Sequence, residues 1–599
     1  MPPKKPAAKA AQASGKKSTT TKASVTTTKA KASTIKSTTK ATAKTPTKAA
    51  ATKTATSKAA ATKSATTKAA PSKITKTTTS KVTKVTKVAK PTKTATAAKA
   101  KPVAPPKAKP APEKPAASKK RKAASPEEEE DKENLAPAGR PTKRARAVKH
   151  EVEEVVVPAG PLNKTPAQVL DIFVFGTGEN GELGLGPVKT EATRPRLIPA
   201  LNTGDAKSFH VVDIFCGGMH TIALTKDNKI VTWGVNDNGA LGRDTNWEGG
   251  LRDADEGSDD DSETGDLNPK ESTPTAIPSN VFPKGTVFTQ VAAGDSCSLA
   301  LTEDGRVYGW GTFTDSKGDK MFGFDEEGNE IKVQPTPILI PGLTDVVQIT
   351  CGANHALALD SHGTAYAWGV GEQSQLGRRV ASRRQRTRAF MPQPIHTLEG
   401  KAKYISSGHF HSFVVDTHDN VWSWGLNSFG QTGYAKTAGK DNGAVSTPMK
   451  VASLSGKNVT SLGGGAHHSA AVTQDGKCYI WGRIDGGQLG IKFTDAQIKD
   501  PKLVRLDDRE KPRICLRPTE VPEVGSAVHV GCGTEHTIIV NSEGVAYSTG
   551  FGTQGQLGLG SYDDIDTFQQ IPKERVKGKK LTWSGAGGQF SIVAAPVDA

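Results

Sequence analysis

The stretch that decides the fold reads CGGMHTIALTKDNKIVTWGVNDNGALG and spans residues 216–242. It opens with a Gly-x-x-His motif at Gly217–His220, carries a Trp-Gly pair at 233–234 and closes with Gly-x-Leu-Gly at 239–242. Two runs of alternating apolar residues lie between these motifs, and the pair Asp227-Asn228 separates them. This order predicts a strand, a tight turn and a second strand.

The same pattern recurs along the chain, and such repetition is the signature of repeat architectures. Further whole copies occupy residues 351–377, 407–433, 464–490 and 532–558, and residues 293–311 open as the others do and then depart. Residues 171–186 contain only the second half of the pattern, whereas residues 585–595 contain only the first half. Six whole copies and two complementary halves therefore make seven repeats.

A repeat divided between the two ends of a chain indicates a closed ring, since a linear solenoid has no reason to split a unit in this way. In a ring, the N-terminal strand joins the C-terminal strands in one blade and removes the frayed seam. The repeats are rich in strand patterns and lack a helical period. We therefore predict an all-β fold, a seven-bladed β-propeller closed by the two half-repeats, over residues 161–599. Trp side chains should fill the space between blades.

Residues 1–160 differ from this domain in composition. The first 150 residues contain no Phe, Trp or Tyr and carry 38 Lys and Arg against 7 Asp and Glu. The formal charge of the whole chain is +19, so its positive charge comes from this segment. Such a segment cannot bury enough apolar surface to offset the entropy of ordering it, so we expect a disordered Lys-, Ala- and Thr-rich tail. Its closely spaced lysines favour non-specific, salt-sensitive contacts with DNA phosphates, and a solubilising role is the alternative.

Two basic clusters in the tail, about 20 residues apart, look like a bipartite nuclear import signal. The clusters consist of Lys119, Lys120, Arg121 and Lys122, followed by Lys143, Arg144 and Arg146. Chance clustering in a Lys-rich tail is the alternative. We expect a nuclear, chromatin-associated protein with a nuclear import receptor among its partners.

Motifs for covalent chemistry are absent from the sequence: it has no Gly-rich phosphate loop, no Gly-x-Ser-x-Gly and no His-Glu-x-x-His. The histidine of the opening motif recurs in five repeats, but each copy belongs to a different blade, so we expect structural histidines bonded to neighbouring backbone. The six cysteines lack CxxC spacing and indicate free buried thiols. We expect no metal and no cofactor. We also expect no membrane partner, because no run of 18 apolar residues occurs.

Functional residues are expected where the repeats disagree. The variable positions inside the opening motif should lie at one mouth of the channel, where a ring of polar groups suits a protein partner. These positions include Asp295, Asn354, His467 and Glu535. The alternative is that these side chains only solvate the loop ends.

One closing turn is longer than the others. Eight residues separate the Trp, or its equivalent, from the Leu or Thr of the closing motif in six repeats, but Trp310 and Phe322 are twelve residues apart. We therefore predict that residues 312–324 form a protruding turn, and such turns on rigid scaffolds often carry function. A tolerated insertion is the alternative.

Two further departures concern charge. Leu251–Glu271 is an acidic insertion that we interpret as a mobile loop, which either masks the basic tail or is inert. Arg378–Arg388 packs six arginines into one loop, and Arg suits bidentate pairing with carboxylates or phosphates. A solvated loop is the alternative for this arginine cluster.

The chain resembles a known family through several short motifs. GGMHT at 217–221, NDNGALGRDT at 236–245, AGDS at 293–296 and the repeated GQLG are similar to the regulator of chromosome condensation family, over about residues 171–595. The resemblance implies a chromatin-bound exchange factor for the nuclear GTPase Ran, which releases bound GDP or GTP without covalent chemistry and is not an enzyme in that sense. The product, Ran-GTP, would serve nucleocytoplasmic transport and mitosis.

The resemblance also implies a site, in which one propeller face docks on the GTPase and a wedge-like turn pushes at the nucleotide-binding region. Its residues here would be Glu179, Asp295, Thr314, Asp315, Ser316, Lys317, Gly318, Asp319, Lys320, Met321, Asn354, His467 and Glu535. The chain carries Asn354 where the family has a functional Asp, and Glu179 stands where relatives carry Asp.

Chromatin attachment in the family uses the tail and a basic propeller loop. The segment after Pro394 carries only Lys401 and Lys403, which leaves more of that role to the tail. The rival interpretation is a chromatin-bound propeller that acts as an interaction module and exchanges nothing. The longer turn and Asp295 distinguish the two interpretations, because a generic repeat protein has little reason to keep both on one face.

Overall fold

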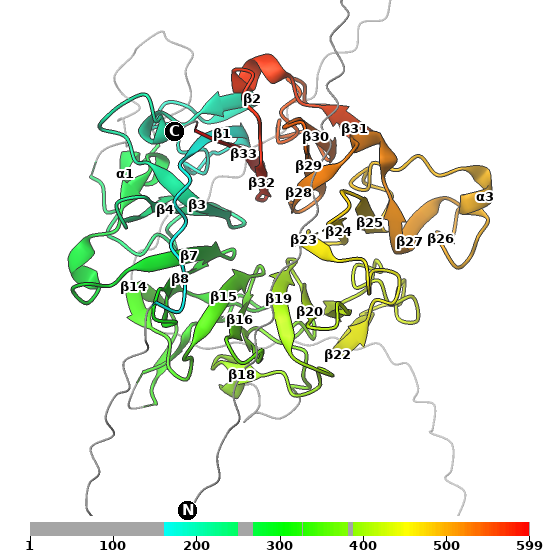
Figure 1. Cartoon of the computed structure of the whole chain (residues 1–599), viewed down its shortest axis with the longest axis horizontal. Helices are drawn as coiled ribbons and strands as arrows, with labels where there is room; N and C mark the ends of the chain where they lie inside the picture. The colour runs from blue at the N-terminus through cyan, green and yellow to red at the C-terminus, as the bar shows by residue number, and fades with distance from the viewer. Residues whose placement is uncertain (1–160, 249–266, 326–327, 381–386, 598–599) are drawn as a thin grey trace, which may run out of the picture. The chain divides into compact units, whose positions relative to one another are not determined.

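Seven β-sheets surround a central channel (Figure 1). The structure is a computed structural model that describes residues 161–248, 267–325, 328–380 and 387–597. The prediction of a seven-bladed, nearly all-β propeller is confirmed within these ranges. The predicted tail, residues 1–160, lies outside the described residues.

The ring closes as the split repeat predicts. Blade 1 has the strand order β2-β1-β33-β32, so strands from the two ends of the domain lie in one sheet. Strand β1 (Leu170–Thr177) pairs antiparallel with β33 (Phe590–Pro596) over seven consecutive residue pairs, from Leu170 opposite Pro596 to Gly176 opposite Phe590. This pairing joins the ends of the domain without leaving an edge strand at the seam.

Each blade is an antiparallel sheet whose strands follow one another from the channel to the rim, apart from the split blade 1. Blade 1 contains β2 (Glu191–Leu197), β1, β33 and β32 (Trp583–Ala586). Blade 2 contains β3 (Val211–Cys216), β4 (His220–Thr225), β5 (Ile230–Gly234) and β6 (Thr275–Ala276). Blade 3 contains β7 (Phe288–Ala293), β8 (Cys297–Thr302), β9 (Val307–Gly311) and β14 (Gln334–Leu339).

The remaining blades repeat this order, and blade 6 has a fifth strand. Blade 4 contains β15 (Val346–Cys351), β16 (His355–Asp360), β17 (Ala365–Gly369) and β18 (Gln393–Pro394), and blade 5 contains β19 (Ala402–Ser407), β20 (His411–Asp416), β21 (Val421–Leu426) and β22 (Ala444–Lys450). Blade 6 contains β23 (Val459–Gly464), β24 (His468–Thr473), β25 (Cys478–Arg483), β27 (Pro512–Glu520) and β26 (Val504–Leu506). Blade 7 contains β28 (Ala527–Cys532), β29 (His536–Asn541), β30 (Ala546–Gly550) and β31 (Ile565–Gln570).

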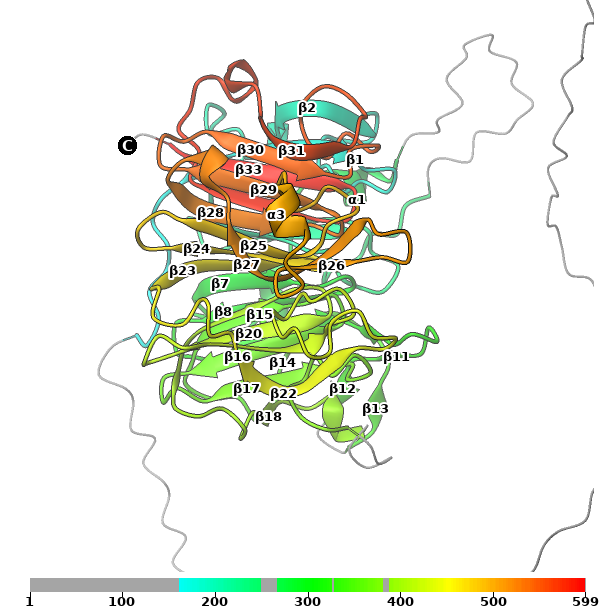
Figure 2. The same ribbon diagram turned by 90° about the vertical axis from the view of Figure 1, so that its right-hand side faces the viewer.

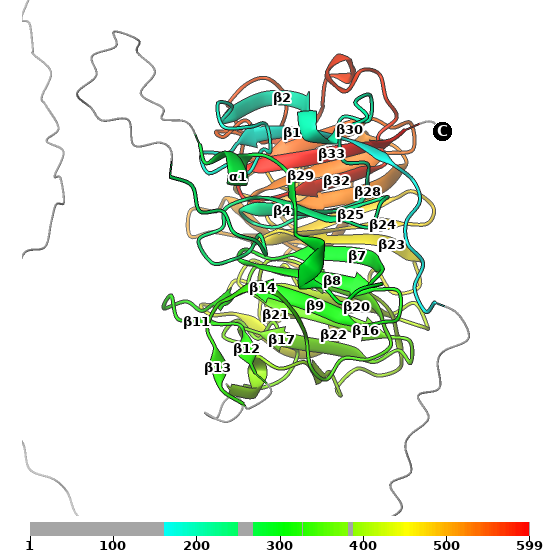
Figure 3. The same cartoon turned by 90° about the vertical axis from the view of Figure 1, so that its left-hand side faces the viewer.

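Other elements are short. Two hairpins follow β9: β10 (Phe313–Thr314) with β11 (Lys320–Met321), and β12 (Gly323–Phe324) with β13 (Glu330–Ile331). The helices that lie wholly within the described ranges include α1 (Pro269–Ser272), α3 (Asp495–Ile498), η1 (Pro199–Leu201), η2 (Ser279–Val281), η3 (Pro522–Val524) and η4 (Lys573–Val576). The hairpin of β10 and β11, residues 313–321, stands out from one flat face of the ring (Figures 2 and 3). We call it the protruding hairpin.

The opening motif needs its glycine because the histidine ring lies over it. A Cβ added at Gly352 would lie 2.1 Å from Cε1 of His355, and one at Gly408 would lie 2.2 Å from Cε1 of His411. Real Cβ atoms do not approach a ring atom so closely, so any larger residue would displace the histidine. The glycine therefore keeps the imidazole buried at the boundary between two blades.

The buried histidines hold neighbouring blades together. His355 Nε2 lies 2.9 Å from Ser412 Oγ of the next blade, and that hydroxyl donates to the carbonyl of Gln375 at 3.0 Å. Because the single hydroxyl proton is used on the carbonyl, the imidazole Nε2–H is the donor to Ser412. The equivalent pairs are His220 with Ser298, His411 with Ser469, His468 with Thr537 and His536 with Ser591.

The tryptophans reinforce the same boundary, as the sequence predicts. Trp424 Nε1 donates to the carbonyl of Gln375 at 2.8 Å, which is the carbonyl that also accepts from Ser412. Trp310 and Trp481 bond the preceding blade in the same way, at 2.8 and 2.9 Å. We call the His, the hydroxyl, the carbonyl and the indole together the inter-blade latch. The sequence interpretation expected the histidines to bond backbone, whereas Nε2 bonds a side-chain hydroxyl.

Two blade boundaries lack the histidine–hydroxyl pair of the latch, whereas the two boundaries of blade 7 keep this pair but have Thr549 and Phe175 in place of the indole. Between blades 1 and 2, Phe590 stands where the others have histidine, and Thr221 Oγ1 is buried without a hydrogen-bond partner among the described residues. Between blades 3 and 4, the histidine and hydroxyl positions are Cys297 and Ala356, which pack in one apolar cluster. The protruding hairpin lies at this second boundary.

Candidate functional site

A closed ring of backbone hydrogen bonds forms one mouth of the channel. In each blade, the first variable residue of the opening motif donates its N–H to a carbonyl of a neighbouring blade, at 2.8 to 3.3 Å. The donor and acceptor pairs are Gly218 and Gly294, Asp295 and Ala353, Ala353 and His409, His409 and Gly465, Ala466 and Thr534, Thr534 and Gly587, and Gly588 and Gly218. The ring fixes the positions from which side chains reach the channel and the surrounding face.

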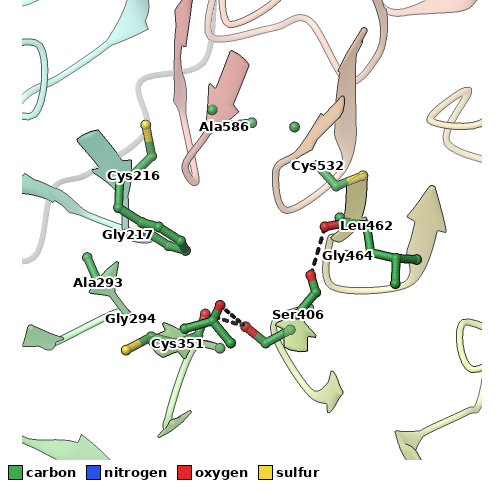
Figure 4. Close-up of a pocket in the computed structure, with 18 of the residues that line it drawn as sticks. Cys216, Gly217, Ala293, Gly294, Cys351, Ser406, Leu462, Gly464, Cys532 and Ala586 are labelled. Carbon is green, nitrogen blue, oxygen red and sulfur yellow. Dashed lines mark hydrogen bonds between the residues drawn. The ribbon is translucent and has the colours of Figure 1, made fainter. Parts of the chain in front are cut away.

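The channel itself is narrow and lined mostly by small residues and sulfur (Figure 4). Its volume is about 280 Å³. Ser406 Oγ donates to the carbonyl of Leu462 at 2.7 Å and Ser407 Oγ to that of Cys351 at 2.6 Å, so these wall hydroxyls are already used. Burial raises the pKa of the Cys216 thiol, which keeps it protonated and unreactive. All six cysteines are free, as the sequence predicts.

Asp295 and His409 line the channel near this mouth. Burial raises the pKa of Asp295, and His409 opposes the rise; burial lowers the pKa of His409, and Asp295 opposes that shift. Asn354 Nδ2 lies 3.5 Å from Asp295 Oδ2. Of the sequence-predicted residues, Asp295 and Asn354 are therefore neighbours, and His409 completes a small polar group that can present hydrogen-bond donors and acceptors to a partner.

Asn354 also connects this polar group to the protruding hairpin. Its Oδ1 accepts the backbone N–H of Thr314 at 2.7 Å. Phe313, at the root of the hairpin, is fully buried and stacks on Phe322 with ring centroids 6.3 Å apart. The root is thus part of the core, while residues 316–320 are exposed. The structure supports the prediction of a protruding turn over 312–324, although Gly323 and Phe324 already belong to the next hairpin.

The tip of the hairpin is closed by its own aspartate. Asp315 Oδ1 accepts the N–H groups of Lys317 and Asp319, both at 2.9 Å, and the Asp315 carbonyl accepts from Gly318 at 3.0 Å. Gly318 adopts φ of 84°, a conformation that favours glycine. These hydrogen bonds within the turn give the tip a defined conformation. Such a tip can push into a groove of a partner.

A second polar group contains His467 and Glu535. Arg483 Nη1 donates to Glu535 Oε1 at 2.6 Å, and His467 Nδ1 lies 4.0 Å from the same oxygen. Burial, with Arg483 second, lowers the pKa of His467 to about 4, so the imidazole is neutral near pH 7 and the ion pair is that of Arg483. Phe429 packs edge-on against His467 and lies under the guanidinium groups of Arg483 and Arg513, each 5.2 Å from the ring centroid.

The two groups and the protruding hairpin share one face because of strand direction. Strands alternate in direction within a blade, so the opening-motif turns and the turns after the third strand lie at the same end of the sheets. Glu179, in the β1–β2 turn, is exposed at this end too, but no other predicted site residue contacts it in the described interactions. The face therefore offers a rigid tip, an Asp-Asn-His group and an Arg-Glu-His group.

The described parts of the other charged segments make their contacts within or beside their own blades. Arg378 Nη1 donates to the carbonyl of Ala367 at 2.9 Å, so this member of the arginine cluster serves its own blade. Lys403 pairs with Asp419 at 3.2 Å. Residues 381–386, most of the acidic insertion (251–266) and the import clusters at 119–122 and 143–146 lie outside the described residues.

The described residues offer no candidate metal centre, and their inter-blade histidines are neutral. Their His, Cys, Asp and Glu side chains do not form a group of three or more that could hold a metal ion. Burial lowers the pKa of His355, His468 and His536 to about 3, so these imidazoles are neutral structural donors. Among the helices in the described ranges, none has the length and hydropathy to span a membrane.

Sequence reasoning missed four residues of this face: Glu372, His409, Phe429 and Arg483. His409 occupies the same motif position as Asp295 in another repeat, so an alignment of the repeats contained its signal. The other three lie in the turns after the third strand or at their edges, where turn length is the main signal that the sequence carries. Their partners come from different blades, which the pattern of one repeat does not reveal.

Comparison with known proteins places this geometry in a family. Residues 171–593 match the RCC1-like domain family. The guanine nucleotide exchange factor SRM1 of Saccharomyces cerevisiae is 39% identical over 434 residues, which cover 71% of this chain and 87% of that protein.

Two solved yeast structures are similar to this chain. The crystal structure of Prp20p from Saccharomyces cerevisiae, described with its binding to Gsp1p and histones, is 36% identical with a TM-score of 0.64, covering 72% of this chain and 92% of that one. The structure of Kap60 bound to yeast RCC1 (Prp20) has the same TM-score at 34% identity, covering 76% of this chain and 97% of that one.

Proposed function

This chain belongs to the RCC1-like domain family, and on that premise we propose that it is a guanine-nucleotide exchange factor for a Ran-type small GTPase. The observation that carries the proposal is the face itself. One rigid, internally closed hairpin stands beside two polar groups, on a ring whose mouth is fixed by backbone hydrogen bonds. The relative named as an exchange factor and the yeast structure described with Gsp1p support the same assignment.

Exchange by this face needs no covalent step. An exchange factor accelerates release by binding the nucleotide-free GTPase more tightly than the nucleotide-bound form. In our proposal the tip of the hairpin, residues 315–320, enters the nucleotide-binding region and displaces groups that hold the phosphates. Contacts between the propeller and the GTPase offset the affinity that the nucleotide loses. Cellular GTP, in excess over GDP, then makes the loading directional.

Each part of the face has a role in this proposal. Asp295 and Asn354 present polar groups beside the hairpin, and Asn354 also holds Thr314. Neutral His467 and the pair of Glu535 with Arg483 form the second contact region. Glu179 adds an exposed carboxylate at the same end of blade 1. The tip consists of Asp315, Ser316, Lys317, Gly318, Asp319 and Lys320, with Thr314 and Met321 in the hairpin strands.

We also propose a nuclear, chromatin-associated protein that generates Ran-GTP for nucleocytoplasmic transport and mitosis. Histones are named with the similar yeast protein, and Kap60 is bound to it in the second structure. The basic clusters at 119–122 and 143–146 are the expected import signal, and the lysine-rich tail is the expected contact with DNA.

Release of fluorescent GDP from a purified Ran-type GTPase tests the function and the site. The full chain should accelerate release by orders of magnitude, whereas Asp295→Ala and a variant with four residues deleted from 315–320 should lose most of this acceleration. Circular dichroism and urea unfolding would verify that the variants are folded. If the folded full chain left GDP release unchanged, the exchange function would be refuted.

A further inference from the structure

The boundary between blades 3 and 4 is held differently from the complete boundaries. Its latch positions are Cys297 and Ala356, which can form neither the imidazole bond nor the hydroxyl bond seen elsewhere. Phe313 and Phe322 of blade 3 instead pack in one apolar cluster with Trp368 of blade 4. The protruding hairpin therefore begins at a boundary where packing, rather than the latch, sets the relation between the two blades.

Two side chains of blade 4 compensate by reaching the backbone of the hairpin. Asn354 Oδ1, from the opening motif, accepts the N–H of Thr314 at 2.7 Å. Glu372 Oε2, from the β17–β18 turn, accepts the N–H of Ser316 at 2.9 Å. The two acceptors come from different loops and act on alternate residues of one hairpin strand and turn.

These two bonds differ in what they hold. Thr314 is part of β10 and follows buried Phe313, so its position is already restricted by the core. Ser316 lies at the exposed tip, where Asp315 closes the turn upon itself but makes no bond to the ring that would fix the angle of the turn. The bond from Glu372 to Ser316 joins the tip to the ring directly.

We propose that Glu372 is a positioning residue for nucleotide exchange, which sets the angle at which the tip of the protruding hairpin meets the GTPase. The inference rests on the proposed exchange function for its consequence but not for its geometry. A carboxylate that accepts a backbone N–H makes a charge-assisted bond, which is shorter and stronger than a neutral one. Fixing the tip before the GTPase arrives reduces the entropy that would otherwise be lost on docking.

The position equivalent to Glu372 is acidic in several other blades, which supplies controls for the loss of one carboxylate. The same position after the third strand is Glu179 in blade 1, Asp237 in blade 2, Ser428 in blade 5, Asp485 in blade 6 and Thr553 in blade 7. Asp485 pairs with Arg483 of its own turn. Asp237 is exposed and has the same charge on the same face, which makes it a matched control for the loss of one carboxylate.

The test compares the full wild-type chain with Glu372→Ala, Glu372→Gln and Asp237→Ala. GDP release is measured over a range of GTPase concentrations to separate kcat from KM. Hydrogen exchange of the peptide 312–324, measured by mass spectrometry without the GTPase, reports the Ser316 amide independently of activity.

We expect Glu372→Ala to lower kcat about fivefold with KM changed less than about twofold, and to speed exchange of the 312–324 peptide about fivefold. Glu372→Gln keeps an acceptor oxygen but makes a weaker, neutral bond, so it should lie closer to wild type than to Glu372→Ala in both readouts. Asp237→Ala should leave the exchange of the peptide unchanged.

Several results would overturn the proposal. Unchanged peptide exchange in Glu372→Ala would refute the contact, whatever the activity. Equal loss of kcat in Glu372→Gln and Glu372→Ala would show that charge rather than positioning matters. A wild-type chain that releases no GDP, together with faster peptide exchange in Glu372→Ala, would refute the exchange function while leaving the structural contact intact.

Discussion

The inter-blade latch predicts opposite outcomes for the same chemical change at two equivalent positions. Thr537 and Thr221 both follow the opening-motif position in the second strand of a blade, and both are fully buried. Thr537 Oγ1 lies 2.9 Å from His468 Nε2 and donates to the carbonyl of Gln488 at 2.8 Å. Thr221 Oγ1 has no partner among the described residues, because Phe590 replaces the histidine. Thr→Val removes each hydroxyl and keeps the β-branched shape.

The magnitudes follow from what each hydroxyl does. Thr537→Val loses two hydrogen bonds and leaves the His468 imidazole N–H buried without an acceptor, which should lower the free energy of unfolding by about 2 to 4 kcal/mol. Thr221→Val removes a buried hydroxyl that forms no bond, so the free energy of unfolding should stay the same or rise by up to about 1 kcal/mol. The free energies of unfolding of the two variants should therefore differ by more than the error of the measurement.

Urea unfolding of the full chain, followed by Trp fluorescence, measures both variants against wild type. The five tryptophans at the inter-blade positions are almost fully buried, so unfolding should change their emission strongly; they are Trp233, Trp310, Trp368, Trp424 and Trp481. Equal m values would allow the midpoints to be compared as stabilities. Shifts of the same sign and size in Thr537→Val and Thr221→Val would refute the latch as a source of stability.

Three further predictions concern pH and packing. Burial lowers the folded-state pKa of the latch histidines to between about 3 and about 4 where a value is resolved, so the unfolded chain binds more protons below pH 6.5 and stability is lost as the pH falls. Each should cost about 1.4 kcal/mol at pH 5.5, and a urea midpoint that stays constant from pH 7.5 to 5.5 would contradict this. Burial raises the pKa of Asp213 to about 7, so its own contribution is lost as the pH rises from about 4 to about 7. Asp213→Asn keeps an acceptor for Val291 N–H and should gain about 2 to 3 kcal/mol over wild type between pH 5 and pH 8; a gain that is independent of pH would count against it. Gly352→Ala would place a Cβ 2.1 Å from His355 and should cost at least about 2 kcal/mol, while Gly204→Ala, whose Cβ would have its nearest neighbour at 3.4 Å, should change stability by less than about 0.5 kcal/mol; similar urea midpoints for the two variants would disprove the steric argument.

The fold could be predicted from the sequence because each blade repeats the same local rules. The alternation of Thr221–Thr225 and the turn at Asp227-Asn228 are local patterns, and Asn228 indeed adopts φ of 62° in that turn. The half-repeats at the two ends predicted a closed ring, because a repeat that is split between the ends of a chain is completed when those ends pair in one blade. The glycine of the opening motif makes room for the histidine ring, and the structure shows this close approach.

The candidate site was only partly predictable because its contacts cross between blades. The length of the 312–324 segment revealed a protrusion, but not that Asn354 and Glu372 hold its backbone. The bonds of the latch histidines to hydroxyls of the next blade depend on how two repeats face each other. Likewise, the pair of Arg483 with Glu535 joins residues 52 positions apart, which no pattern within one repeat can show.

The affinity of the full chain for a nucleotide-free Ran-type GTPase, compared with its affinity for the same GTPase loaded with GDP, tests the central claim most directly. Exchange by differential binding predicts that the nucleotide-free form binds at least about 100-fold more tightly, equivalent to about 2.7 kcal/mol, and that added GTP dissociates the complex. Equal affinities for the two forms would contradict the account, because a partner that binds both equally cannot shift the equilibrium toward release.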